Sequence, residues 1–103
     1  MTVEPLTDEE IEGRLRDLPG WSEQEDRLTR RYAFDGHLAA AGLVGQIARI
    51  QDELDHHSDV LLGYDTVTVS VNTHSVGGKI TELDFTLAHR VEEAASAHPT
   101  LRR

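Results

Sequence analysis

The sequence predicts a single α+β domain in which a four-stranded antiparallel sheet carries its helices on one face. Three runs of residues repeat apolar side chains at helical spacing, and another alternates apolar and polar side chains as a strand does. The predicted order is α-β-β-α-β-β-α, and tight turns between paired strands are typical of antiparallel sheets. The 103 residues allow one domain, residues 1–103, and we expect its ends, residues 1–5 and 98–103, to be loose.

The first helix begins at a capping box. Residues 7–10, Thr-Asp-Glu-Glu, place a hydroxyl at the N-cap and a carboxylate three residues later, and the acids match the helix dipole. Apolar residues at helical spacing follow as far as Leu18, where Pro19-Gly20 ends the helix. Residues 21–25 and 27–34 then predict two strands that form a hairpin.

From Gly36 the hydrophobic period becomes that of a long amphipathic helix, which we expect to reach about His56. The short apolar run 60–62 and the strictly alternating run Thr66–Thr73 predict the second pair of strands. We expect the valines of the alternating run to face the helices. Gly77-Gly78 then predicts a turn, which leads to the last helix.

The last helix begins at a second capping motif, Thr81-x-x-Asp84. Apolar residues recur along it at helical spacing to about Ala97, and Pro99 ends it. The sequence therefore predicts a capping box at the start of both the first and the last helix.

The composition excludes several classes of protein. There is no cysteine, so disulfides, thiolate metal sites and thiol nucleophiles are excluded. Nineteen acidic against ten basic side chains argue against binding to nucleic acid. Glycine and charged residues interrupt the longest apolar stretch, residues 38–50, and residues 1–5 do not resemble a signal peptide. We therefore expect a soluble, cytoplasmic protein with no membrane partner.

The stretch that indicates chemistry is residues 52–58, Asp-Glu-Leu-Asp-His-His-Ser, at the expected end of the long helix. On a helix, Asp52 would share a face with His56, and Glu53 would share a face with His57. A carboxylate beside an imidazole favours the charged ring and can determine which nitrogen carries the proton. We therefore expect histidine and carboxylate pairs here, aimed into a cleft.

A third histidine, His74, follows the alternating strand directly after Thr73. Three imidazoles at the ends of elements, with carboxylates nearby, indicate a general acid–base site. Two alternatives remain open: histidines that only complement a helix dipole, and a zinc or iron site. The His-Glu-x-x-His spacing of zinc-binding helices is absent, and adjacent histidines on a helix are a poor chelating pair. We therefore expect no metal. The other histidines (His37, His89 and His98) are interpreted as surface or helix-end residues.

These motifs together resemble the pterin-4a-carbinolamine dehydratase family. That family has a Gly-Trp pair, a basic and aromatic strand, an acid-x-x-x-His-His-Pro block, a strand that ends in Thr-His, and a Gly-Gly turn before Thr/Ser-x-x-Asp. The corresponding residues here are Gly20-Trp21, Leu28 to Phe34, Asp52 to His57, Val67 to His74, and Gly77 to Asp84. The match covers about Leu15 to His89.

The resemblance implies a role for each matching residue. His56 and His74 resemble the acid and base histidines, and Asp84 resembles the aspartate that supports the site. His57 resembles a histidine that binds and orients the pterin. Asp52 occupies the acidic position before the pair, and Thr73, in the Thr-His pair, is expected in the substrate-binding set.

The implied reaction removes water from 4a-hydroxytetrahydropterin to give quinonoid dihydropterin, which recycles the cofactor of aromatic amino-acid hydroxylases. An acid must protonate the departing hydroxyl, and a base must remove the proton on N5. Imidazoles titrate near neutral pH and can serve in either role. No cofactor is expected. The resemblance also implies a homodimer or homotetramer.

Three positions depart from the family pattern. Ser58 stands where the family has proline, Val60 where an aromatic residue is common, and one extra residue precedes Thr81, which displaces Asp84 by one position. These departures motivate an alternative: a pterin-binding or protein-assembly module of the same fold with weakened catalysis.

Overall fold

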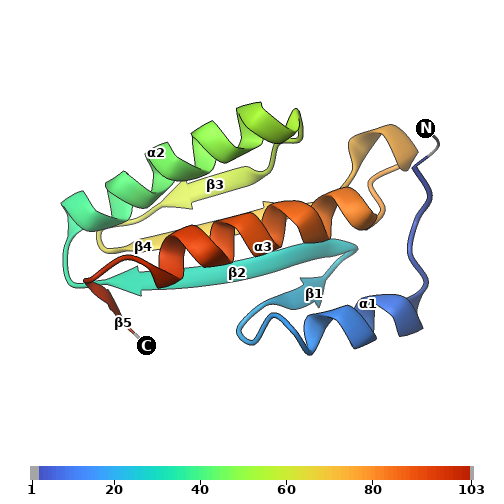
Figure 1. Cartoon of the computed structure of the whole chain (residues 1–103), viewed down its shortest axis with the longest axis horizontal. Coiled ribbons are helices and arrows are strands. Elements are labelled where there is room, and N and C mark those ends of the chain that lie inside the picture. Colours follow the sequence, from blue (N-terminus) through green and yellow to red (C-terminus); the bar gives the residue numbers. More distant parts are fainter. Residues whose placement is uncertain (1–2, 103) are drawn as a thin grey trace.

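The structure is a computed structural model, and it describes residues 3–102 (Figure 1). Three α-helices, a short 3₁₀ helix and five strands follow one another along these residues. Their bounds are α1 Asp8–Leu15, β1 Ser22–Gln24, β2 Arg27–Phe34, α2 His37–Leu54, β3 Asp59–Leu62, β4 Thr66–Val71, η1 His74–Val76, α3 Glu82–Ser96 and β5 Leu101–Arg102. The predicted α+β class and the predicted order of the main elements are confirmed.

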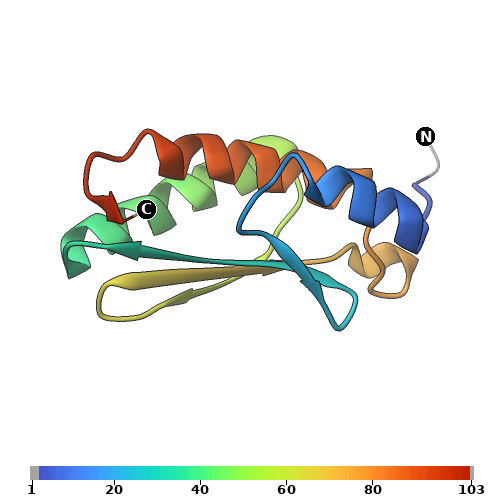
Figure 2. The ribbon, with the colours of Figure 1, turned by 90° about the horizontal axis from the view of Figure 1, so that it is seen from below.

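The sheet is antiparallel throughout, with the strand order β1-β2-β4-β3 and β5 paired to the end of β2. The central pair, β2 and β4, runs in register from Leu28 opposite Val71 to Ala33 opposite Thr66. The three helices lie on one side of this sheet (Figure 2). The second face of the sheet carries no helix among the described residues, which agrees with the predicted two-layer arrangement.

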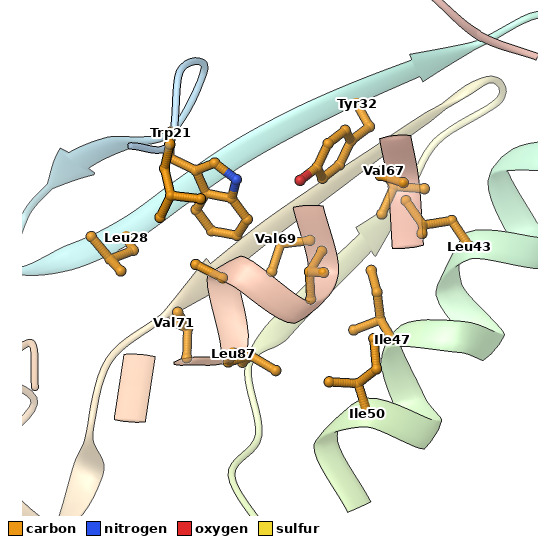
Figure 3. Close-up of a cluster of buried hydrophobic side chains, with 14 of the residues drawn as sticks. Trp21, Leu28, Tyr32, Leu43, Ile47, Ile50, Val67, Val69, Val71 and Leu87 are labelled. Carbon is orange, nitrogen blue, oxygen red and sulfur yellow. The ribbon is translucent and has the colours of Figure 1, made fainter. Parts of the chain in front are cut away.

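The core lies between the helices and the sheet. Every second residue of β4 is buried, namely Val67, Val69 and Val71, so the predicted inward face of this strand is confirmed. The apolar stripe of α2 and residues of α3 close over these valines (Figure 3). The stripe of α2 consists of Ala40, Leu43, Ile47 and Ile50. Alternation in the strand and helical spacing in α2 thus place complementary apolar faces in contact.

A partly buried polar cluster joins α3 to the edge of this core. The Glu92 carboxylate accepts hydrogen bonds from the Tyr32 hydroxyl at 2.6 Å and from the Trp21 indole N–H at 3.0 Å. The Trp21 and Tyr32 rings lie edge to face (Figure 3). The guanidinium of Arg30 lies 4.4 Å from the centroid of the Tyr32 ring. Both aromatic polar groups therefore have the partner that burial requires.

This cluster shifts the pKa of two of its members. Burial and the Glu92 carboxylate raise the pKa of the Tyr32 hydroxyl far above its ordinary range. Burial acts to raise the pKa of Glu92, but hydrogen bonds from Tyr32, Trp21 and Ser96 and the nearby charge of Arg30 outweigh it, so that pKa is lowered. Glu92 is therefore held as a carboxylate whose hydrogen bonds join the helix to the sheet.

Several element ends differ from the prediction. The first helix stops at Leu15, and Leu18 is buried from the turn that follows it. The strand β4 ends at Val71, and Thr73 forms only an isolated bridge with Lys79. A turn can bury an apolar side chain as well as a helix can, so hydrophobic spacing alone did not locate the end of α1.

The expected loose C-terminal end is wrong for residues 101–102. Leu101 pairs with Phe34 and Arg102 pairs with Ala33, which adds a two-residue fifth strand to the sheet. β1 pairs with only the first residues of β2, so the backbone N–H and C=O groups at the end of β2 lack a partner strand on that side. β5 forms hydrogen bonds with some of these groups. Residues 1, 2 and 103 lie outside the described part of the chain, and residues 3–5 have no regular secondary structure.

Among residues 3–102, no helix is both long enough and apolar enough to cross a lipid bilayer.

Candidate active site

Three chain segments form the site: the residues after α2, the junction between β4 and η1, and the first turn of α3. All three lie toward the end of the molecule where α3 begins (Figure 1). The helix α2 ends because Asp55 adopts the left-handed conformation, with φ 51° and ψ 43°. The backbone N–H groups of Asp55 and His56 then bond to carbonyls of the last helical turn. His56 and His57 therefore lie beyond the helix rather than on it.

Asp84 is the centre of the site and is completely buried, with an exposed fraction of 0%. Its Oδ1 lies 2.6 Å from Nε2 of His56. Its Oδ2 accepts the backbone N–H of Thr81 at 2.8 Å and the hydroxyl of Thr73 at 2.9 Å. One carboxylate thus joins the histidine after α2, the end of β4 and the start of α3.

The start of α3 positions this carboxylate. Thr81 is the N-cap, and Asp84 is the third residue of the helix, so the predicted capping box is confirmed. In a capping box the acidic side chain turns back to the N-cap backbone, which restricts its orientation. The hydroxyls of Thr73 and Thr81 lie 2.7 Å apart behind it. The carboxylate therefore directs its Oδ1 toward His56 in a fixed orientation.

The extra residue before Thr81 does not displace Asp84 from the site. Gly77 and Gly78 both adopt positive φ, 76° and 74°, in a turn that returns the chain to Thr73. The Thr73 N–H then bonds to the Lys79 carbonyl at 2.9 Å. Glycine reaches these angles without steric cost, so the glycine pair makes room for the additional residue.

The carboxylate pairing predicted at the end of α2 is wrong in its details. Asp52 lies 3.1 Å from Nε2 of His57 rather than beside His56. Glu53 pairs with Arg90 of α3 instead of with His57. Helical geometry would have paired residues four apart, but the left-handed Asp55 turns the two histidines away from the helix direction. Both members of the Asp52–His57 pair are exposed, whereas His56 and Asp84 are largely shielded from solvent.

His74 is exposed at the first position of η1, directly after Thr73. The structure thus joins His56, Thr73 and Asp84 through hydrogen bonds, pairs His57 with Asp52, and places His74 next to Thr73 in the chain. Among the described residues, no three histidine or carboxylate side chains converge in a group that could hold a metal ion.

Gln51 is a site residue that the sequence did not indicate. Its side-chain oxygen accepts the backbone N–H of Ser58 at 2.7 Å and also contacts the Ser58 hydroxyl. Its backbone carbonyl accepts the N–H of His56 at 3.1 Å. Gln51 therefore holds both ends of the His56-His57 segment. A polar residue at a core-facing helical position was the signal that could have revealed it.

A histidine held by a buried carboxylate is an arrangement that can exchange a proton with a bound molecule. The structure thus combines a small α+β domain with a largely buried histidine–carboxylate pair.

Comparison with known proteins identifies the family. Residues 4–94 match the family described as pterin 4 alpha carbinolamine dehydratase. A Streptomyces avermitilis protein to which pterin-4-alpha-carbinolamine dehydratase activity is attributed is 59% identical over 95% of this chain and 97% of its own length. A Streptomyces coelicolor protein with the same attribution is 54% identical over the same shares. The chain belongs to the pterin-4-alpha-carbinolamine dehydratase family, and its activity is that of a dehydratase.

Solved structures agree with this assignment. The crystal structure of a transcriptional coactivator/pterin dehydratase from Brucella melitensis matches with a TM-score of 0.83 and 33% identity, over 87% of this chain and 97% of that chain. A pterin dehydratase-like RuBisCO assembly factor of the alpha-carboxysome matches with a TM-score of 0.61 at 22% identity, over 72% and 87% of the two chains. The second likeness concerns the fold alone.

Proposed function

We propose that this dehydratase acts on a 4a-hydroxytetrahydropterin through His56 and His74 as the acid–base pair. One imidazole protonates the hydroxyl on C4a as the C4a–O bond breaks, and water leaves. The other imidazole removes the proton from N5 as the double bond between N5 and C4a forms, which gives the quinonoid dihydropterin. In this proposal the reaction recycles the pterin cofactor of aromatic amino-acid hydroxylases.

The observation that carries the proposal is the 2.6 Å contact between Nε2 of His56 and the buried Asp84. A buried carboxylate orients an imidazole and stabilises its charged form as a proton arrives. The same arrangement would serve little purpose for a histidine that only complements a helix dipole. His74 enters as the second imidazole through its place beside Thr73 and through the family pattern.

The remaining site residues have supporting roles in the proposal. His57 and Asp52 form an exposed pair that binds and orients the pterin ring. Thr73 supports the site without contacting the pterin. The residue is only 2% exposed, and its hydroxyl donates a hydrogen bond to Asp84. No cofactor takes part in the step.

The alternative is a pterin-binding or assembly module with weakened turnover. Two of the three departures that motivated it leave the site geometry intact, since Asp84 reaches His56 and Gln51 holds Ser58. These contacts favour turnover. Pterin binding without product formation by the purified protein would instead support the module.

The test is a dehydration assay in which chemically prepared 4a-hydroxytetrahydropterin is converted to quinonoid dihydropterin. We expect the His56→Ala and His74→Ala variants to lose roughly 10²-fold or more in rate, the usual size of a general acid–base contribution. His89→Ala, an exposed histidine of α3, is the matched control and should retain the full rate. Wild-type protein that does not exceed the rate in buffer would refute the proposal.

We also propose that the chain forms a homodimer or homotetramer. Strand β3 lies at an edge of the sheet, and Leu61 on it is 70% exposed, as expected for a strand that pairs with a second copy. Light scattering should give a mass above that of one chain, and Leu61→Lys should lower it. A monomer at micromolar concentration would contradict this part of the proposal.

A further inference from the structure

Four polar groups, three of them on buried side chains, form a line of hydrogen bonds behind the site. The backbone N–H of Leu83 and the hydroxyls of Thr81 and Thr73 lead in sequence to Oδ2 of Asp84, over distances of 3.1, 2.7 and 2.9 Å. Thr73, Thr81 and Asp84 are each buried. This line begins at the first turn of α3 and ends on the carboxylate that contacts His56.

Each hydrogen bond in the line can run in only one direction. The Asp84 carboxylate only accepts, so the Thr73 hydroxyl must donate its single proton to Oδ2. The Thr73 oxygen can then only accept from Thr81, so Thr81 donates its proton to Thr73. The oxygen of Thr81 is left to accept the N–H of Leu83, as observed. Both hydroxyls are thereby used, and neither is free to rotate.

The direction of this line extends to the histidine. With Oδ2 occupied by Thr73 and by the Thr81 N–H, Oδ1 of Asp84 remains as the acceptor for His56. Since a carboxylate cannot donate, Nε2 of His56 must carry a proton. The neutral ring then has its lone pair on Nδ1, which becomes the only nitrogen of His56 able to take a proton from a substrate.

We infer that Thr73 and Thr81 are positioning residues for the dehydration, because their directed hydroxyl chain holds Asp84 in the orientation that keeps the proton of His56 on Nε2. The inference rests on the proposed role of His56. The two hydroxyls touch no reacting atom in this scheme. They set the orientation of the carboxylate, and the carboxylate sets the tautomer of the ring that exchanges the proton.

The test combines histidine ¹⁵N NMR with the dehydration assay. In the wild-type protein the ring of His56 should show a protonated Nε2 and an unprotonated Nδ1. Thr73→Val keeps the shape of the side chain but removes the donor, and we expect a mixture of tautomers with kcat lowered roughly tenfold, since a lost bond to a charged acceptor has about this effect. Thr73→Ser restores the hydroxyl and should restore both measurements.

Thr81 gives an independent test if the Thr73→Val protein does not fold. Thr81→Ser keeps the cap and the hydroxyl and should behave as wild type, while Thr81→Val should reproduce the mixed tautomer and the lower kcat. Circular dichroism confirms that each variant is folded. A folded Thr73→Val or Thr81→Val protein with the wild-type tautomer and rate would overturn the inference.

These outcomes separate the inference from the proposed function. If His56→Ala loses activity while the valine variants keep both the tautomer and the rate, only the hydroxyl chain is refuted. If His56→Ala retains the wild-type rate, the proposed role of His56 itself is refuted.

Discussion

The two capping boxes of this protein have the same local construction and different surroundings. At the start of α1, the hydroxyl of Thr7 accepts the Glu10 N–H, and the Glu10 carboxylate accepts the Thr7 N–H. At the start of α3, Asp84 accepts the Thr81 N–H in the same way. The first box is exposed, whereas Thr81 and Asp84 are both completely buried.

The difference shows how a helix cap can become part of a site. Glu10 lies on the surface, where its carboxylate caps the helix. Asp84 lies where three segments meet. Its Oδ1 therefore contacts the imidazole of His56, and its Oδ2 accepts the hydroxyl of Thr73 in addition to the cap N–H. Burial raises the importance of each of these bonds, because an unpaired polar group there would have no water to replace its partner.

The largest expected effect that separates the two boxes is on catalysis. Asp84→Asn replaces the acceptor that faces Nε2 of His56 with an amide that has only one acceptor oxygen. We expect the dehydration rate to fall roughly 10²-fold or more, because the ring loses its orienting charge. Glu10→Gln makes the same chemical change in the exposed box and should leave the rate within experimental error. Equal rates for both variants would remove the distinction.

The next effect is on stability. Thr81→Ala removes a buried N-cap and leaves Thr73 without its donor, so we expect a loss of about 2 kcal/mol in the free energy of unfolding. Thr7→Ala removes an exposed cap, for which about 1 kcal/mol is expected. Urea unfolding of both variants measures the difference. A larger loss in Thr7→Ala would contradict the assignment of the buried box as the more important one.

A third carboxylate, Glu92 of α3, sharpens the comparison because it is partly buried but contacts no histidine among the described residues. Its folded pKa is below the ordinary value of 4.5, so its charged form stabilises the fold above that pH. Glu92→Gln should therefore lower stability most near neutral pH. The difference should shrink as the pH falls through the folded pKa.

Urea unfolding of wild type and Glu92→Gln at several values between pH 7 and pH 3 measures this effect. The dehydration rate at neutral pH is the control, and it should not change. A stability difference that grows as the pH falls would show that the carboxylate is not the stabilising form.

The smallest effect concerns Glu10 and has the same sign. Hydrogen bonding to the backbone and hydroxyl of Thr7 lowers the pKa of Glu10 below its ordinary value. The stability that Glu10 adds is thus complete above that value and is lost as the pH falls through the folded pKa. In Glu10→Gln we expect a slight destabilisation at pH 7 that disappears in acid. Thermal unfolding at pH 7 and pH 3 checks this, and a difference that persists at pH 3 would argue against it.

Local patterns predicted most of the fold and only part of the site. Alternation located β4, helical spacing located α2, and the two capping boxes located the starts of α1 and α3. The partners of the carboxylates were predicted less well. Asp52 was expected beside His56, but the left-handed Asp55 turned the chain so that His57 received it. A single backbone angle decides this, and no side-chain spacing reports it.

Contacts between distant segments were beyond local patterns altogether. The pairing of β5 with β2 depends on where the chain returns after α3. The bond from Tyr32 to Glu92 joins residues 60 positions apart. Many residues in the sequence could have supplied such partners.

The sequence by itself determined most of the secondary structure and the identity of the chemical groups. Helical and strand periods follow from the backbone geometry of each element, and a capping box is complete within four residues. Only the tertiary structure decided that Asp84 faces His56 from behind a pair of threonine hydroxyls. The reason is physical: hydrogen bonds act over about 3 Å, and only packing brings residues from separate segments that close.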